Sequence, residues 1–193
     1  DAVNASLDTY QASGVEFDRQ AIYDQIIEFF VTRPKVILRD SGVSPDSVEA
    51  VLATGIVEPA VIIARARALE AARAQSAEVF DDLATAYARA HNLADTALGD
   101  TVDESLMDVD ELALDKATNE AAVAVERALA VDDYDAALQA LAALRTPIDT
   151  FFEDVLIMDK DEALRNNRLR LLNRFVAVFA NVADFAKMTK TAK

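Results

Sequence analysis

The chain has 193 residues, of which 52% are hydrophobic, and it contains no cysteine. This composition suits one large domain with an ample core, and it excludes disulfides, thiolate nucleophiles and cysteine metal sites. No apolar run approaches membrane-spanning length and no basic leader precedes an apolar segment, so we expect a cytoplasmic protein that has no membrane partner. Because the chain opens on Asp1 rather than Met, we also expect it to be a piece of a longer protein.

The formal net charge of −15 is distributed unevenly along the chain. Residues 1–94 carry −6, residues 95–163 carry −15 and residues 164–193 carry +6. A polyanion would be repelled by the acidic middle and could approach the basic end. The charge therefore does not exclude a nucleic-acid partner, but it predicts weak non-specific binding.

Helical periodicity and capping signals predict an all-α fold, a bundle of about eight helices without strands. Residues 1–16 are polar and only weakly periodic, so we interpret them as a leader or linker remnant before a helical domain at residues 17–193. The helices are expected from Phe17 to about Asp40, Pro45 to near Gly55, Pro59 past Leu69, Ser76 to about Ala97, Glu111 to about Val131, Tyr134 to about Leu144, Pro147 through Leu156, and Asp161 to Met188.

Two of these helices carry specific expectations. Pro34 lacks a backbone N–H and its ring meets the preceding turn, so it should bend or break the first helix. No Gly or Pro occurs from Asp161 to Met188, so the last helix should be long and uninterrupted, with Asp159 or Asp161 as its cap. Its apolar stripe is broad, and we assign to the core the phenylalanines at positions 151, 152, 175, 179 and 185.

The second half of the chain carries a family resemblance over several motifs. Pro147–Ile148–Asp149, Phe151–Phe152 and Asp161–Glu162–Ala163–Leu164–Arg165 resemble the end of the bacterial glycyl-tRNA synthetase beta subunit. Ala86–Tyr87 with Arg89 and Asn92 also fits this family. The family's segment is an all-helical anticodon-binding domain of the DALR type, named for the Asp-Ala-Leu-Arg motif that residues 161–165 resemble.

The resemblance covers roughly residues 17–188 and implies a function. The parent enzyme, a glycine-tRNA ligase, would attach glycine to its tRNA using ATP and Mg, with the catalytic centre in a separate alpha subunit. This chain would contribute tRNA recognition. Its implied partners are the tRNA accepting glycine, the synthetase alpha subunit and the rest of the beta subunit.

The residue inventory itself provides no catalytic chemistry. His91 is the only histidine, with Asn92 after it and Ala88 three residues before it, so zinc and di-iron histidine motifs cannot form. Neither a Gly-rich phosphate loop nor a Gly-x-Ser-x-Gly elbow occurs. We therefore expect no catalytic residue, no metal site and no cofactor in this chain, which is non-catalytic by itself.

Binding chemistry instead falls to arginine and asparagine, which can fork onto phosphates or base edges and stack on unpaired bases. For Arg168, which lies within an apolar stripe, we favour pairing with a nearby carboxylate. Arg89 and Asn92 suit either RNA contact or a structural role, and Arg65 suits a solubilising or ion-paired role as well. The candidate tRNA-binding residues are Arg65, Arg89, Asn92, Arg165 and Arg168.

Two functions of different classes remain open. The first is tRNA binding near the anticodon, and the second is a structural or protein-interaction module that docks on another subunit through an acidic face. Convergence of Arg65, Arg89 and Arg165 on one exposed patch would favour tRNA binding. Scattered or ion-paired arginines would favour the interaction module.

Overall fold

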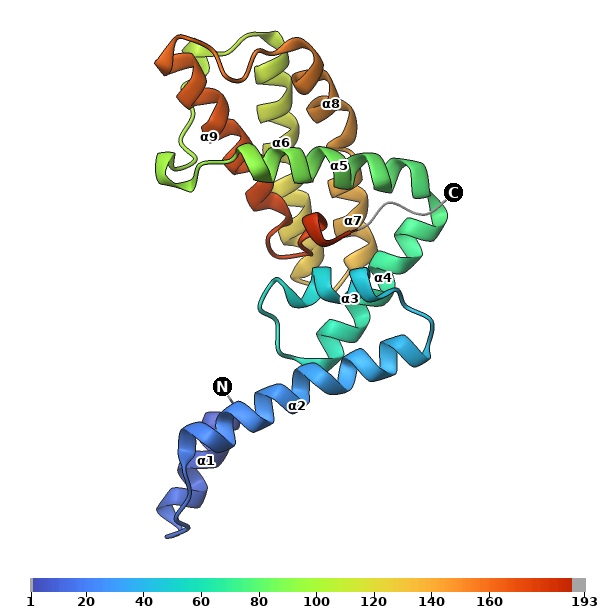
Figure 1. Cartoon of the computed structure of the whole chain (residues 1–193), viewed down its shortest axis with the longest axis vertical. Helices are drawn as coiled ribbons and strands as arrows, with labels where there is room; N and C mark the ends of the chain where they lie inside the picture. Colours follow the sequence, from blue (N-terminus) through green and yellow to red (C-terminus); the bar gives the residue numbers. More distant parts are fainter. Residues whose placement is uncertain (1, 189–193) are drawn as a thin grey trace.

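The computed structural model describes residues 2–188 as nine α-helices and three short 3-10 helices, with no strand in that range (Figure 1). The all-α class is therefore confirmed. The α-helices are α1 Ala2–Ala12, α2 Arg19–Asp40, α3 Pro45–Leu52, α4 Pro59–Gln75, α5 Ala77–Leu93, α6 Val109–Leu129, α7 Tyr134–Ala142, α8 Arg145–Asp154 and α9 Glu162–Phe179; the 3-10 helices are η1 Thr96–Leu98, η2 Glu104–Leu106 and η3 Phe185–Lys187.

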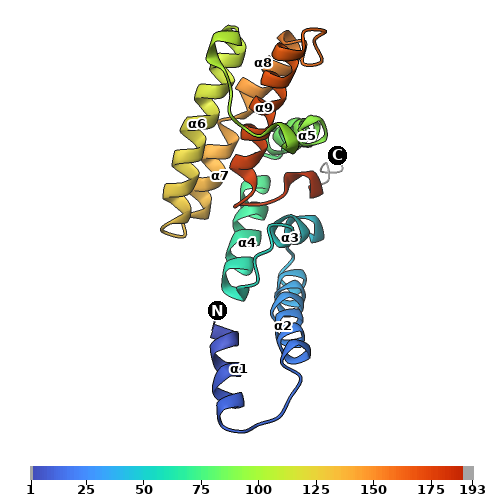
Figure 2. The same cartoon turned by 90° about the vertical axis from the view of Figure 1, so that its left-hand side faces the viewer.

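Helix α1 lies in the segment for which no helix was predicted. Leu7 is its single buried residue, and the apolar positions at helical spacing, Val3, Leu7 and Tyr10, span only two turns, which is too short a pattern to predict a helix. The helix packs against α2. Figures 1 and 2 show α1 and the first half of α2 projecting from the other helices.

Helix α2 is continuous through Pro34, so the predicted break is wrong. Pro34 is buried, and so is Leu38 one turn later. The second half of α2 packs against α3 and α4, and this packing offsets the lost hydrogen bond and the ring clash that proline imposes within a helix. The predicted end was correct, because α2 ends at Asp40 and Gly42 follows with a φ of +83°.

Helix α9 ends nine residues earlier than the predicted Met188. The chain turns after Phe179, and the short helix η3 follows at Phe185. The backbone N–H of Asp184 donates to the carbonyl of Ala50 in α3 at 2.8 Å. Val182 and Phe185 are buried, so their apolar periodicity reflects a segment that folds back into the core rather than a continued helix.

A cluster of aromatic rings fills the space between α5, α9 and η3. The ring centroid of Phe179 lies 4.8 Å from that of Tyr87 and 5.0 Å from that of Phe185, while Phe80 stacks on Phe185 at 5.2 Å. Aromatic pairs at these separations stabilise a core beyond their buried area. The cluster fixes α5 across the bundle formed by α6, α7, α8 and α9 (Figure 1).

Buried polar contacts fix the start of α3 against α4. Ser44 occupies the predicted N-cap position, but its hydroxyl makes no capping bond and instead donates to the Glu70 carboxylate. The hydroxyl of Ser47, which is buried, donates to the same oxygen at 2.8 Å. Glu70 thus ties α4 to the first turn of α3.

Candidate nucleic-acid interface

The connection between α8 and α9, residues 155–161, is ordered by two aspartates. The Asp161 carboxylate accepts the backbone N–H groups of Ala163 at 2.8 Å and Leu164 at 3.4 Å, and so caps α9 as predicted. The Asp159 carboxylate accepts the N–H of Asp161 at 2.9 Å. This bond lowers the pKa of Asp159, and the nearby Arg168 guanidinium lowers it further. The Asp159 carboxylate is therefore ionised at neutral pH.

Arg165 and Arg168 hold the same connection from the first two turns of α9. The Arg165 Nη1 donates to the carbonyl of Asp159 at 2.9 Å, and the Arg168 Nη1 donates to the carbonyl of Leu156 at 2.9 Å. Arg168 also forms ion pairs with Glu111 at 3.1 Å and Asp159 at 3.2 Å. The pairing of Arg168 with a carboxylate is thus present, whereas its part in RNA contact stays a prediction.

Arg89 and Asn92 form one wall of an open groove of about 880 Å³ beside this connection. They lie three residues apart on the last turns of α5, and both are exposed. The Arg89 guanidinium lies over the ring of Phe152 in α8, 4.0 Å from its centroid. Across residues 2–188, Arg89 makes no ion pair and the Asn92 side chain makes no hydrogen bond, so both remain available to a ligand.

The opposite wall is the chain from the end of α8 to Met158. Leu156 and Met158 are 69% and 59% exposed, which leaves apolar side chains free beside the Arg89 guanidinium. Glu153 and Asp154 also line the groove and bring negative charge to it. The groove can therefore stack on and hydrogen-bond a nucleobase, while its carboxylates limit how much phosphate it attracts.

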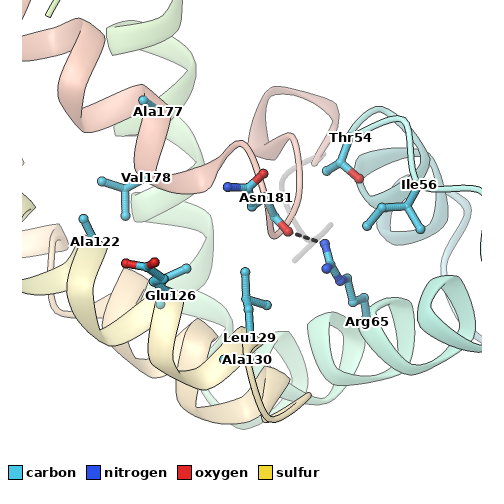
Figure 3. A pocket seen from close by; sticks show the side chains of 11 residues that line it. Thr54, Ile56, Arg65, Ala122, Glu126, Leu129, Ala130, Ala177, Val178 and Asn181 are labelled. Carbon is cyan, nitrogen blue, oxygen red and sulfur yellow. Dashed lines mark hydrogen bonds between the residues drawn. The ribbon is translucent and has the colours of Figure 1, made fainter.

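Arg65 lies elsewhere, in a separate cavity of about 630 Å³ between α4, α6 and the end of α9 (Figure 3). Its guanidinium donates to the backbone carbonyl of Asn181 and lies 5.3 Å from the ring centroid of Tyr134. Carbonyls just beyond the end of a helix attract cations. These contacts give Arg65 a structural role that joins α4 to the turn after α9.

The three arginines whose convergence would favour tRNA binding therefore do not share one patch. Arg89 lines the groove, Arg165 holds the connection next to it, and Arg65 lies by the other end of α9. The position of Arg65 is the outcome that favours an interaction module, whereas the gathering of Arg89, Asn92 and Arg165 around one connection favours a binding site there.

Sequence reasoning missed part of this groove. Phe152 was assigned to the core but is half-buried beneath Arg89, and Leu156 was placed on a helical face although α8 ends at Asp154. The signal for this wall was the apolar pair Leu156 and Met158, which the structure leaves exposed. These residues become part of a groove only because α5, about sixty residues earlier in the sequence, lies opposite them.

The arrangement of the described residues also bears on metal binding and on membrane insertion. In the part of the chain that the structure describes, no three His, Cys, Asp or Glu side chains are grouped so that they could hold a metal ion. Across the same residues, no helix is both long enough and apolar enough to cross a membrane.

The groove lies in the stretch of the chain that matches a known protein family. The DALR anticodon binding domain matches residues 83–189, which include Arg89, Asn92 and Arg165 but not Arg65. The chain is 40% identical over 183 residues to a glycine--tRNA ligase beta subunit of Desulforamulus reducens, covering 93% of this chain and 26% of that protein.

Two other glycine--tRNA ligase beta subunits are similar to the chain. The beta subunit of Moorella thermoacetica is 37% identical over 191 residues, covering 97% of this chain and 27% of that protein. The beta subunit of Vibrio cholerae is 38% identical over 173 residues, covering 88% of this chain and 25% of that protein. The chain thus spans about a quarter of the length of the curated relatives that it matches.

Proposed function

Since the chain belongs to the family of DALR anticodon-binding domains, we propose that it holds a tRNA accepting glycine at its anticodon region, as part of a glycine--tRNA ligase beta subunit. The observation that carries this proposal is the position of the family match. Residues 83–189 span both walls of the groove and the connection that shapes it.

The groove offers three kinds of contact to a single-stranded loop. The exposed face of the Arg89 guanidinium can hold a phosphate or stack on an unpaired base. The Asn92 amide carries both donors and an acceptor and can read a base edge. Leu156 and Met158 supply apolar surface against which a base ring packs.

The proposed role separates binding from reaction chemistry. Glycine activation would use ATP and Mg at a catalytic centre in the alpha subunit, and this chain would raise the affinity of the assembled ligase for tRNA. We place this work in the cytoplasm, where tRNA is charged. Loss of the groove should therefore weaken tRNA charging and leave the ATP-dependent activation of glycine unchanged.

A gel-shift comparison tests the proposal directly. At low salt the chain should bind the tRNA accepting glycine more tightly than another tRNA, and Arg89→Ala and Asn92→Ala should each reduce this preference. Arg67→Ala is the matched control, because Arg67 is an exposed arginine on α4 outside the family match. Equal binding of both tRNAs, or equal loss in the control, would contradict the proposal.

The interaction module is the second candidate, and the separation of Arg65 from the groove favours it. In a ligase whose beta subunit carries this chain, a module of this kind would give a different result. Arg89→Ala and Arg165→Ala would then either leave charging intact or reduce glycine activation and charging equally. A selective loss of charging assigns the chain to tRNA binding.

A further inference from the structure

The projecting part of the molecule has an apolar face that the rest of the chain does not cover. We define the arm as α1 together with residues 17–30, the chain leading into α2 and its first half (Figures 1 and 2). Within the described residues, α1 packs against α2, whereas α3 and α4 pack against the part of α2 that lies outside the arm (Figure 1). The arm thus depends on very few contacts of its own.

An open apolar groove of about 530 Å³ runs between the two helices of the arm. Ser6 is the one polar side chain among the residues found to line it. Tyr10, which also lines the groove, is 59% exposed, and Phe29, next to the lining residue Phe30, is 60% exposed. The apolar side chains that line the groove include Val3, Leu7, Phe17, Ile22, Ile26 and Phe30.

Exposed apolar side chains gathered on one face are typical of a contact surface, of which a protein–protein contact is the commonest kind in a soluble assembly. Its charge excludes RNA as the occupant, because residues 2–30 carry five acidic side chains and one basic side chain. An apolar face on an acidic segment fits a protein surface that is apolar at its centre and basic nearby.

The relatives indicate which protein surface this is. In Moorella thermoacetica the match covers 97% of this chain, and so includes most of the arm, yet it accounts for only 27% of the beta subunit. Most of that beta subunit therefore lies outside the stretch that this chain matches. Domains of one chain commonly meet through interfaces of this kind.

We propose that the arm docks onto the part of a glycine--tRNA ligase beta subunit that lies outside the stretch matched by this chain. The proposal rests on the proposed function only in placing the chain within such a subunit. The arm is the mechanical link between the groove that meets tRNA and the remainder of that subunit. Tyr10 and Phe29 are buried in the docked state.

Thiol labelling tests this docking, since the chain has no cysteine of its own. Phe29→Cys is prepared in this chain alone and in a chimera in which this chain replaces the matched stretch of the Moorella thermoacetica beta subunit. Docking predicts that labelling of position 29, followed by mass spectrometry, slows about tenfold or more in the chimera. Val131→Cys, at another exposed apolar position, in the turn after α6, should react at the same rate in both proteins.

Hydrogen exchange provides a second measurement that needs no substitution. Backbone amides aligned with residues 3–30 should exchange more slowly in the intact Moorella thermoacetica beta subunit than in this chain alone. Equal labelling of position 29 in both proteins, or equal exchange of the arm, overturns the proposal. So does a dimer of the isolated chain that Phe29→Ser dissociates, since the arm would then bind a second copy. None of these readouts contains tRNA, so they fail or succeed independently of the anticodon contact.

Discussion

The guanidinium of Arg168 lies between Glu111 and Asp159, and it also donates to the carbonyl of Leu156. Arg168 is 8% exposed and Glu111 is 1% exposed. A carboxylate this deeply buried needs its cation, because an unpaired charge in the interior is strongly destabilising. Arg168 therefore fixes the end of the groove by holding α9, α6 and the α8–α9 connection together.

Arg168→Met should accordingly lower the free energy of unfolding by about 3–5 kcal/mol, the cost of leaving one buried partner unpaired. Chemical denaturation measures this change. Arg170→Met is the control, since the Arg170 Nε donates to the Leu98 carbonyl at 3.1 Å without a buried carboxylate, and it should cost no more than about 1.5 kcal/mol. A variant of Arg168 that keeps its stability but loses tRNA affinity would assign the side chain to RNA contact instead.

Glu70 makes stability depend on pH. Burial raises the pKa of its carboxyl group, but hydrogen bonds from Ser44 and Ser47 outweigh burial, so the pKa lies below its ordinary value of 4.5. A lowered pKa in the folded state means that the ionised carboxylate stabilises the fold above pH 4.5, and that this contribution is lost as the pH falls through the lowered pKa.

Glu70→Gln should therefore destabilise the chain at pH 7 and flatten the decline in stability below pH 4.5. Thermal unfolding followed between pH 7 and pH 3 measures both effects. Glu120→Gln, an exposed glutamate on α6, should leave the pH profile as it is. An unchanged profile for Glu70→Gln would show that the hydrogen bonds from Ser44 and Ser47 do not favour the ionised form.

Among single residues, neighbours on one helix were easier to predict than partners on distant helices. Arg89 and Asn92 are three residues apart, and this spacing alone places them on one face of a helix. The ring beneath Arg89 belongs to Phe152, on a helix about sixty residues later. Local sequence patterns carry no information on such a pair, so the second wall of the groove could not be predicted.

At the scale of the helix, starts were predictable because local chemistry defines them. Pro45 and Pro59 occupy first helical positions, and Asp133 and Asp161 cap the helices that follow them. The end of α9 was not predictable in this way. It depends on the bond from Asp184 to Ala50, which joins parts of the chain that are distant in sequence.

Pro34 leads to a prediction about α2 as a whole. Pro34→Ala restores an N–H to the middle of a continuous helix and removes a ring clash, so it should stabilise the chain by about 1–3 kcal/mol even after the lost packing and added chain entropy. Denaturant unfolding measures this gain. Pro59→Ala should give no gain, because a first helical position requires no N–H. A loss of stability in Pro34→Ala would show that packing of the ring dominates.

For the whole molecule, the charge distribution determines how RNA binding responds to salt. The net charge is −15, and Glu153 and Asp154 line the groove itself. Contact with tRNA must then come from a few local guanidinium groups rather than from the overall field. Few phosphates are neutralised, and few counterions are released.

We therefore expect a shallow salt dependence for the binding of tRNA accepting glycine. The slope of log K against log salt should correspond to roughly one to three phosphates, or about −0.7 to −2 for a single strand. Titrations between low and moderate salt measure it. A slope several times steeper would require a basic surface that the groove lacks.

The bond between Asp184 and Ala50, together with the insertion of Phe185 among the rings, has a consequence for synthesis on the ribosome. Asp184 follows Ala50, and Phe185 follows Phe80, by more than a hundred residues, so α3 and the ring-bearing face of α5 emerge long before the segment that covers them. Contacts between such distant residues form late, and apolar surface exposed in the meantime favours aggregation. The nascent chain therefore has to keep this surface from other chains until the turn after α9 has been translated and has closed over it.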